Sequence, residues 1–465
     1  MVVGGCAAGA CGDDDSSAVD DGADAASNPE SGGGNVDSSV TGDSSALDAN
    51  ADSSLADAAD AADASLLSPS FVFRDINHIL STGQSLSVGS QGNTILSTTQ
   101  PYENITFTNG PRYNAAGLVS FTPLIESGVE TMSSGLANLV TKMAREVVLV
   151  GQPAAKSSHD LLVSVHGIGG RTYADLKKGG NTAAYANGMA QAQAGHDLAM
   201  ADMKSHVIRC VTNVHGESDH RDENPSYEAN LLEWQADYEA DVKAITGQAE
   251  PVPMFHTQLS SWTRYRSSTT SDVAMAQLSA HVVAPGKVIL VGAKYHLQHA
   301  ADGVHLTSES YQHMGEDYAK AYRRVILEGK PWEPVRPKTV TRAGAVITAK
   351  MYVPAPPLVI DTTLVTEPTI PGSKFGFEWS DDEDPTTRPT VTNVVLTGGD
   401  TVVITLSKTP TGANKRLRYA YTGVAGALGG PTTGVRGNLR DSDATVSPNG
   451  YKLYNWGVHF DVASP

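Results

Sequence analysis

The pattern of apolar and polar positions divides the chain into three stretches. Residues 7–66 consist mainly of Ala, Asp, Ser and Gly, and the first aromatic side chain is Phe71. Short apolar runs then alternate with amphipathic stretches of helical period as far as Lys330. Beyond Lys330 helical periodicity is absent, and Pro and Thr become common. We therefore expect a spacer at 1–66, an α/β domain at 67–334 and an accessory domain at 335–465.

Five short apolar runs in the middle stretch are typical of buried strands. Each is rich in Leu or β-branched residues, ends in polar residues or glycine, and is followed by a stretch of helical period. This alternation predicts a parallel sheet covered by helices on both faces, with ligands bound at the carboxyl ends of the strands. The predicted strands are Ile76–Thr82, Leu161–His166, Val207–His215, Val252–Leu259 and Val288–Ala293, and the predicted helices are Ser134–Val148, Ala184–Lys204, Tyr227–Thr246, Ser271–Val282 and Ser308–Glu328.

The last stretch has the two-residue period of antiparallel strands. Thr339–Val353 alternates on either side of Ala343-Gly344, and Val391–Leu406 has a hairpin pattern with its turn at Gly398-Gly399-Asp400. Tyr451–Val462 alternates again. The pattern predicts an antiparallel β-sandwich.

The charge of the 465-residue chain is unevenly distributed. Its formal net charge is −18, but 14 of the 51 acidic residues and none of the 33 basic ones lie within residues 1–66. The remainder carries 33 positive and 37 negative charges, so it is close to neutral. Without an excess of Lys and Arg, no nucleic-acid partner is expected.

The first residues bear on where the protein resides. Residues 2–6, Val-Val-Gly-Gly-Cys, resemble the end of a bacterial lipoprotein signal, in which the cysteine becomes lipidated. The charged and most of the apolar parts of such a signal are missing, so an accidental small-residue start is the alternative. The acidic stretch after Cys6 is typical of a disordered spacer. We expect a secreted, outer-surface or periplasmic lipoprotein with a membrane tether through lipidated Cys6.

Two of the predicted strand ends carry the side chains of nucleophilic catalysis. Ser85 follows the first strand in a glycine-flanked turn, which can hold a serine exposed beside free backbone N–H groups. Asp302 and His305 follow the last strand. A carboxylate three residues before an imidazole can orient the ring and leave its other nitrogen to take a proton.

Together with a middle block, these segments resemble the SGNH (GDSL-like) hydrolase superfamily. The closest branch is the sialate O-acetylesterase and acetylxylan esterase type, in which a Gly-Gln-Ser, a Gly-Glu-Ser-Asp and an Asp-x-x-His block occur in this order. Here these are Gly83–Ser85, Gly216–Asp219 and Asp302–His305, each after a predicted strand. The resemblance covers roughly residues 75–330. It implies a three-layer α/β/α, flavodoxin-like domain.

The resemblance also implies roles for individual residues. Ser85 would be the nucleophile, His305 the general base and then acid, and Asp302 the residue that orients His305. The remaining oxyanion-hole and substrate-binding residues would be Gly128 (with Gly117 as the second choice), Gly216, Ser218, Gln84 and Glu217. The superfamily has an asparagine donor where this chain has Ser218, which leaves the third oxyanion donor open. Neither a metal nor a cofactor is required.

Other polar and aromatic residues allow more than one interpretation. His296, His299 and His305 with Asp302 could form a metal cluster, although the Asp-x-x-His loop already has a role. His215 and His220 are better explained as pocket walls or structural residues than as ligands. Residues 166–170, His-Gly-Ile-Gly-Gly, could line the cleft or form a plain turn. Trp262, Tyr265 and Tyr295 could stack on a sugar, although core or rim packing is the simpler interpretation.

We therefore expect a serine esterase that hydrolyses short-chain acetyl esters, with an acetylated carbohydrate or other small ester as its substrate. One alternative is a lipase or polyester hydrolase with the same serine chemistry. The other is a non-catalytic carbohydrate-binding or adhesion protein that keeps the fold, which the accessory domain makes plausible. Acyl-chain preference and labelling of Ser85 by a serine-reactive probe distinguish the three.

Overall fold

A seven-stranded sheet forms the centre of the α/β region in the computed structural model, which describes residues 66–153 and 156–465. The strand order is β3-β2-β4-β1-β5-β6-β7, and every neighbouring pair is parallel except β2 and β3. The strands are β1 (Ile76–Gly83), β2 (Ile105–Phe107), β3 (Phe121–Pro123), β4 (Leu161–Val165), β5 (His206–Val214), β6 (Met254–Gln258) and β7 (Val288–Ala293).

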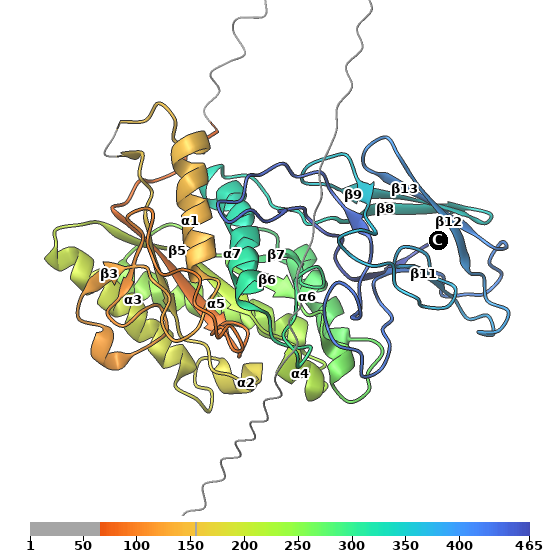
Figure 1. The fold of residues 1–465 in the computed structure, drawn as a ribbon, viewed down its shortest axis with the longest axis horizontal. Helices are drawn as coiled ribbons and strands as arrows, with labels where there is room; N and C mark the ends of the chain where they lie inside the picture. Colours follow the sequence, from red (N-terminus) through yellow and green to blue (C-terminus); the bar gives the residue numbers. More distant parts are fainter. Residues whose placement is uncertain (1–65, 154–155) are drawn as a thin grey trace, which may run out of the picture. The chain divides into compact units, whose positions relative to one another are not determined.

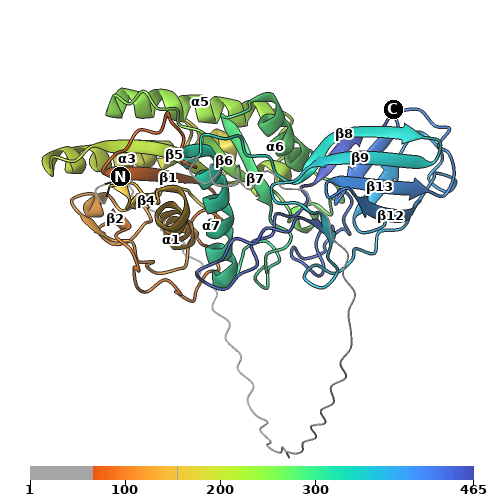
Figure 2. The ribbon, with the colours of Figure 1, turned by 90° about the horizontal axis from the view of Figure 1, so that it is seen from above.

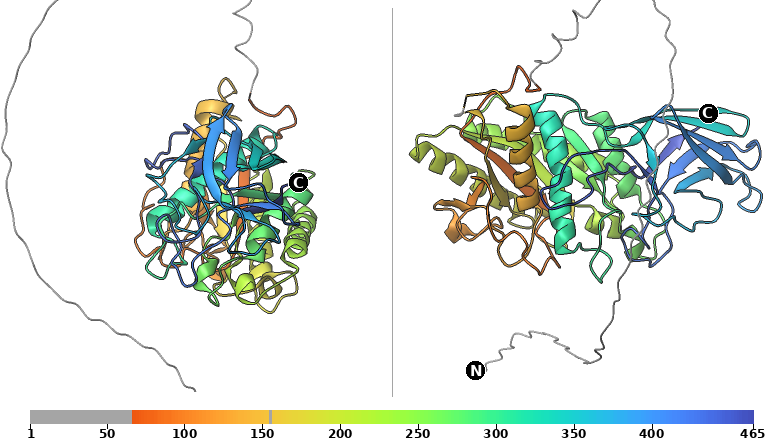
Figure 3. Two further views of the ribbon diagram at one scale, coloured as in Figure 1. Left: turned by 90° about the vertical axis from the view of Figure 1, so that its right-hand side faces the viewer. Right: turned by 45° about the horizontal axis from the view of Figure 1, so that its top comes forward.

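Helices cover both faces of this sheet (Figure 2). Helices α1 and α7 lie side by side on one face, and α3, α5 and α6 cover the other (Figures 2 and 3). Each layer buries its own apolar core against the sheet. The helical segments are α1 (Ser133–Met143), α2 (Tyr173–Leu176), α3 (Ala184–Ala201), α4 (Glu217–Arg221), α5 (Tyr227–Thr246), α6 (Asp272–Val283) and α7 (Ser308–Tyr322), with short η segments at Ala115–Gly117, Ala144–Val148, Trp262–Arg264 and Arg323–Leu327.

The α/β prediction is confirmed, including all five predicted strands and all five predicted helices. Two of the helices end in a π-helical turn, at Ala144–Val148 and Arg323–Leu327, rather than continuing as α-helix. Strands β2 and β3 were not predicted, because three residues are too few to show a period.

The order of the strands makes the end of β1 the topological switch point of the sheet. From β1 the chain crosses to β4 on one side, and from β4 it returns to β5 on the other side of β1. Adjacent connections that leave in opposite directions open a crevice at the carboxyl end of the sheet, where α/β proteins bind ligands. Ser85 follows β1 at this point.

Antiparallel sheets make up the region after residue 335 (Figure 1), as the two-residue period predicts. The largest has the order β12-β13-β9-β8, and β11-β14-β16 and β10-β15 form two smaller ones. Buried and more exposed residues alternate along β9 and β13, so one face of this sheet packs on a common core. The strands are β8 (Arg336–Ala343), β9 (Val346–Tyr352), β10 (Val359–Ile360), β11 (Phe377–Ser380), β12 (Val391–Thr397), β13 (Thr401–Leu406), β14 (Arg416–Tyr419), β15 (Leu439–Arg440) and β16 (Phe460–Ala463).

Residues 449–460 join the two regions. Leu453 belongs to the same buried cluster as the apolar residues of α1 and α7. The side-chain amide of Gln258, at the end of β6, donates to the carbonyl of His459 (2.9 Å) and accepts from its N–H (2.8 Å). The α/β region and the antiparallel region therefore share buried contacts, and the domain boundary between residues 334 and 335 stays a prediction.

The predicted acidic spacer and Cys6 lie outside the described residues. Within the part of the chain that the structure describes, no helix combines the length and the apolar character that crossing a bilayer requires.

Candidate active site

Ser85 lies in a tight turn that β1 enters through Gly83. The φ angle of Gly83 is +125°, and a Cβ at this position would lie 2.2 Å from the carbonyl oxygen of Val214 on β5. Only glycine fits there. The Ser87 hydroxyl donates to the carbonyl of Gln84 (2.7 Å), and the N–H of Ser90 donates to the carbonyl of Ser85 (3.1 Å). These bonds hold the serine at the end of the strand.

His305 and Asp302 meet Ser85 from the loop between β7 and α7. The Oγ of Ser85 lies 2.8 Å from Nε2 of His305, and Nδ1 of His305 lies 2.5 Å from Oδ2 of Asp302. The other oxygen of Asp302 accepts from the backbone N–H groups of Val304 and His305, both at 2.9 Å. The structure thus brings together three residues that the sequence selected from two strand ends 220 positions apart.

The loop geometry keeps Asp302 ionised. Partial burial on its own would raise its pKa, but the hydrogen bonds from the His305 ring and from two backbone N–H groups hold the pKa below the usual value of 3.8. An ionised Asp302 accepts the Nδ1 proton of His305, so that Nε2 presents its lone pair to the Ser85 hydroxyl. The side chain of His305 is 21% exposed, so this group is accessible from outside.

A buried ion pair is linked by hydrogen bonds to the turn that carries Ser85. Nζ of Lys294 lies 3.1 Å from Oε1 of Glu217, and the two side chains are 1% and 0% exposed. The other oxygen of Glu217 accepts from the side-chain amide of Gln84 (3.0 Å), whose carbonyl oxygen accepts from the N–H of Ser218 (3.2 Å). Burial opposes the charge on Glu217, but Lys294 keeps its pKa below the usual value. Gln84, Glu217 and Ser218 are thus bonded to one another within the protein.

The polar contacts of Lys294 continue into the antiparallel region. Its backbone N–H donates to the Ser260 hydroxyl (3.1 Å), which lies 2.9 Å from Nε2 of His459. Nδ1 of His459 lies 2.6 Å from the carbonyl oxygen of Ala420. Neither Lys294 nor His459 is predicted from the sequence, because nothing in the pattern indicates a partner so far along the chain.

Gly169 lies against Ser85, in the loop that follows β4. A Cβ on Gly169 would lie 3.5 Å from the Cβ of Ser85. Among the hydrogen bonds of residues 66–153 and 156–465, none uses the backbone N–H of Ser85 or of Gly169. The three glycines that follow His166 indicate that this loop can approach another backbone closely, although the same pattern is typical of plain turns.

The other glycines selected from the sequence lie elsewhere. Gly128 is in an exposed loop before α1, where a Cβ would meet the guanidinium group of Arg112. Gly117 packs against the carbonyl of Thr108, and Gly216 packs against side chains of α6. The roles of Gly128 and Gly216 in the oxyanion hole stay predictions.

The remaining selected side chains have structural contacts. His215 lies between the Tyr227 hydroxyl (2.7 Å) and the carbonyl of Arg171 (3.0 Å), and it is buried. Trp262 and Tyr295 are fully buried, so core packing and not sugar stacking describes them. His299 is bonded to the carbonyl of Leu297 (3.0 Å). The described residues do form one group of metal-ligating atoms, but His299 is not part of it.

A loop of the antiparallel region lies against the loop that carries Asp302 and His305. The N–H of Gly429 donates to the carbonyl of Gly303 (2.8 Å), and a Cβ on Gly303 would overlap Leu428. Arg264 donates to the carbonyl of Asp302 (3.1 Å) through Nε and to that of Gly426 (3.0 Å) through Nη1. Residues 424–430 thus form one wall beside Asp302.

Comparison with known families identifies the domain. Residues 148–324 match the family model described as carbohydrate esterase, sialic acid-specific acetylesterase. Residues 148–324 are thus similar to the carbohydrate esterase domain of that family. On this match the protein is a carboxylic ester hydrolase, and acetyl ester hydrolysis is the reaction that the family supports. The matched residues include Asp302 and His305, whereas Ser85 precedes them.

One solved structure supports the fold of this chain. The chain is similar to a carbohydrate acetylesterase from Xanthomonas citri, with a TM-score of 0.50 and 14% identity over 83% of this chain and 80% of that one. A protein from Arabidopsis thaliana matches 53% of this chain over 97% of its own, with a TM-score of 0.40 and 16% identity. A search of curated proteins finds no match.

Proposed function

We propose that this protein is a serine esterase that removes acetyl groups from a carbohydrate through an acyl-enzyme intermediate. The observation that carries the proposal is the 2.8 Å contact between the Ser85 hydroxyl and Nε2 of His305, whose other nitrogen faces the Asp302 carboxylate. A serine hydroxyl is a weak nucleophile, and it needs a base at this distance. The family match supports the ester and carbohydrate parts of the proposal.

In the acylation half of the reaction, Ser85 Oγ attacks the acetyl carbonyl carbon while Nε2 of His305 takes the hydroxyl proton. The carbonyl oxygen becomes an oxyanion in a tetrahedral intermediate. This intermediate collapses by breaking the bond to the sugar oxygen, which leaves as an alcohol with the proton from His305. The products are the free sugar hydroxyl and an acetyl ester on Ser85.

In the deacylation half, water takes the place of the sugar alcohol. His305 accepts a proton from water as its oxygen attacks the acetyl carbon. Collapse of the second intermediate breaks the bond to Ser85 Oγ and returns the proton to it. Acetic acid is released, and no metal or cofactor takes part in either half.

The backbone N–H groups of Ser85 and Gly169 are our proposed oxyanion donors. Their side-by-side placement and the absence of a protein acceptor for either, among the described residues, support this assignment. Each such donor contributes about 10²–10³ in rate. Gln84, Glu217 and Ser218 are hydrogen-bonded to one another and support the turn that carries Ser85. We therefore assign them to positioning rather than to substrate contact.

Substitution of the nucleophile tests the reaction. Ser85→Ala should lower kcat for p-nitrophenyl acetate by about 10⁴-fold or more, because no other group can form the acyl-enzyme. Ser90→Ala in the same turn is the matched control and should remain within a few-fold of the natural protein. A fluorophosphonate probe should label Ser85 in the control and nothing in Ser85→Ala. Retained hydrolysis in Ser85→Ala would refute the proposal.

The substrate class has its own test. Acetate release should be measured over a panel of acetylated polysaccharides and sialic acid esters, with Ser85→Ala as the blank. Nitrophenyl esters of increasing acyl length should lose activity beyond short chains; a preference for long chains would favour a lipase-type enzyme instead. The tether through Cys6 stays a proposal, which metabolic labelling with a fatty-acid analogue tests.

A further inference from the structure

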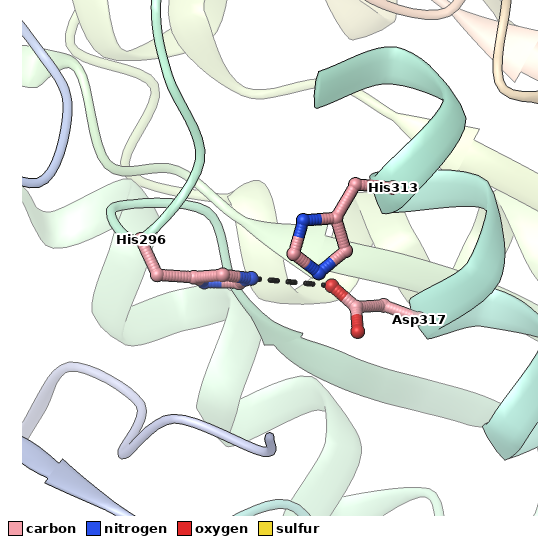
Figure 4. Close-up of side chains that lie close together, drawn as sticks. All are labelled: His296, His313 and Asp317. Carbon is pink, nitrogen blue, oxygen red and sulfur yellow. Dashed lines mark hydrogen bonds and ion pairs between the residues drawn. The ribbon is translucent and has the colours of Figure 1, made fainter. Parts of the chain in front are cut away.

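Three metal-ligating side chains that the proposed chemistry does not use face one another beside α7 (Figure 4). His313 and Asp317 lie four residues apart on α7, and therefore on one face of the helix. His296 reaches them from the loop that follows β7. One ligand atom of each residue lies within 4.8 Å of those of the other two, and in the described part of the chain no other group of His, Cys, Asp and Glu does so.

Asp317 brings a carboxylate to the centre of this cluster. Its Oδ2 lies 3.2 Å from Nε2 of His296, and its Oδ1 lies 3.3 Å from Nζ of Lys320. Although burial opposes ionisation, Lys320 and the His296 hydrogen bond hold the pKa of Asp317 well below its usual range. The Asp317 carboxylate therefore faces His296 on one side and Lys320 on the other.

His313 presents an unpartnered nitrogen to the same carboxylate. Its Nε2 is buried and has no hydrogen-bond partner, and in Figure 4 the ring points toward Asp317. A buried ring nitrogen without a hydrogen-bond partner beside a carboxylate is the arrangement expected where a cation binds between the two groups.

Aromatic rings of the antiparallel region hold both imidazoles in place. His313 stacks on Tyr451 with ring centroids 4.8 Å apart and an interplanar angle of 4°. His296 stacks on Trp456 at 6.0 Å and 15°. A cavity of about 10 Å³, close to the volume of one water-sized particle, is lined by His296, Asp317 and Trp456. Rings fixed in this way lose little freedom when a ligand binds.

We propose that His296, His313 and Asp317 bind one divalent transition cation. Two imidazole nitrogens and one carboxylate oxygen suit Zn²⁺ best, with water as a fourth ligand.

The position of this metal site gives the ion a structural role. His296 lies near the start of the loop that carries Asp302 and His305, and the two α7 ligands follow that loop. A bound ion therefore ties the two ends of the catalytic loop together. It takes no part in the Ser85 chemistry, so the metal proposal and the esterase proposal can fail independently.

Titration of the full chain with Zn²⁺ tests the proposal. The protein is prepared without a polyhistidine tag, stripped with a chelator, and titrated in a calorimeter, with Co²⁺ absorption as a second readout. The same titration is run with Cys6 and Cys11 replaced by Ser, because thiolates also bind these ions. We expect one ion per chain and a higher thermal midpoint in the presence of Zn²⁺.

Near-isosteric variants locate the ion. His313→Gln and His296→Gln should each weaken Zn²⁺ binding at least 10-fold and abolish the rise in thermal midpoint. The matched control is His299→Gln, which removes a nearby buried imidazole outside the cluster and should bind as the natural chain does. If His313→Gln fails to fold, Asp317→Asn replaces it. The proposal is overturned if the stripped chain binds no Zn²⁺, or if His296→Gln and the second variant bind it unchanged.

Discussion

The protonation state of a buried side chain in this protein depends on its surroundings. Glu126, just before α1, is buried, and its Oε1 accepts from the Thr131 hydroxyl (2.9 Å) and the Ser134 N–H (3.2 Å). These donors favour the ionised carboxylate. Burial is the larger opposing effect and the neighbouring Glu130 the second, and together they raise the pKa of Glu126 to about 7. The balance shows that at this position desolvation outweighs several hydrogen bonds.

This raised pKa predicts a pH-dependent stability. The ordinary value for a glutamic acid is 4.5, so between about pH 4.5 and 7 the folded chain keeps a proton that the unfolded chain has released. The contribution of Glu126 to the free energy of unfolding is complete below pH 4.5 and is lost as the pH rises to about 7. Glu126→Gln should reduce the difference in unfolding free energy between pH 5 and pH 8 by about 1–3 kcal/mol.

Urea unfolding at the two pH values measures this difference. The exposed Glu146 on the segment after α1 provides the control, because Glu146→Gln removes a carboxylate without changing a buried group. If the unfolding free energy differed between the two pH values by the same amount in the natural chain and in Glu126→Gln, the assignment would be contradicted.

At the scale of elements, the catalytic loop depends on a segment that is distant in sequence. Arg264 bridges the carbonyl of Asp302 and that of Gly426, so it fixes the loop after β7 to residues 424–430. The carbonyl of Gly303 is bonded to the N–H of Gly429 in the same interface. The orientation of Asp302, and through it of His305, is thus shared between two regions.

Loss of this bridge should affect turnover more than binding. Arg264→Ala should lower kcat for p-nitrophenyl acetate by about 10-fold with little change in KM, because small displacements of a catalytic group cost up to ~10² in rate. Arg266→Ala is the matched control, since Arg266 is bonded to Glu223 and to the carbonyl of His220 instead. An unchanged kcat in Arg264→Ala would show that the loop needs no such support.

The elements that the sequence predicts correctly are those whose pattern is local. The five strands and five helices have enough residues to show a period, and Asp302 and His305 lie within one loop, so their relation is visible in the chain. The role of Lys294 and the contact of Gly169 with Ser85 cannot be predicted in this way, although residues 166–170 were considered as a cleft lining. The buried partner of Lys294 lies 77 positions away, and Gly169 is defined only by its contact with Ser85. Such pairings depend on strand order, which periodicity does not reveal.

At the scale of the whole molecule, residues 449–460 complete the core around α7. Leu453 is 1% exposed within the apolar cluster of α1 and α7, and Lys320 of α7 donates to its carbonyl. Asn449 donates to Glu316 of the same helix. The helix that begins just after His305 is therefore packed against both regions.

Removal of these contacts should destabilise the esterase as a unit. Leu453→Ala should lower the free energy of unfolding by about 2–5 kcal/mol, as is usual for a buried leucine, with fluorescence and circular dichroism changing together in one transition. Val446→Ala, at a position that is 71% exposed, is the control. Deletion of 335–465 should abolish hydrolysis of small esters and polymers alike. A deletion variant that still hydrolyses p-nitrophenyl acetate would contradict this account.

The two hydrogen bonds between Gln258 and His459 join residues 201 positions apart. The ribosome therefore makes Ser85, His305 and all seven strands of the described sheet well before residues 449–460. During synthesis the nascent chain would hold the proposed site residues without the contacts that support them. On the proposed function, hydrolysis would begin only after residues 449–460 emerge and pack against the α/β region.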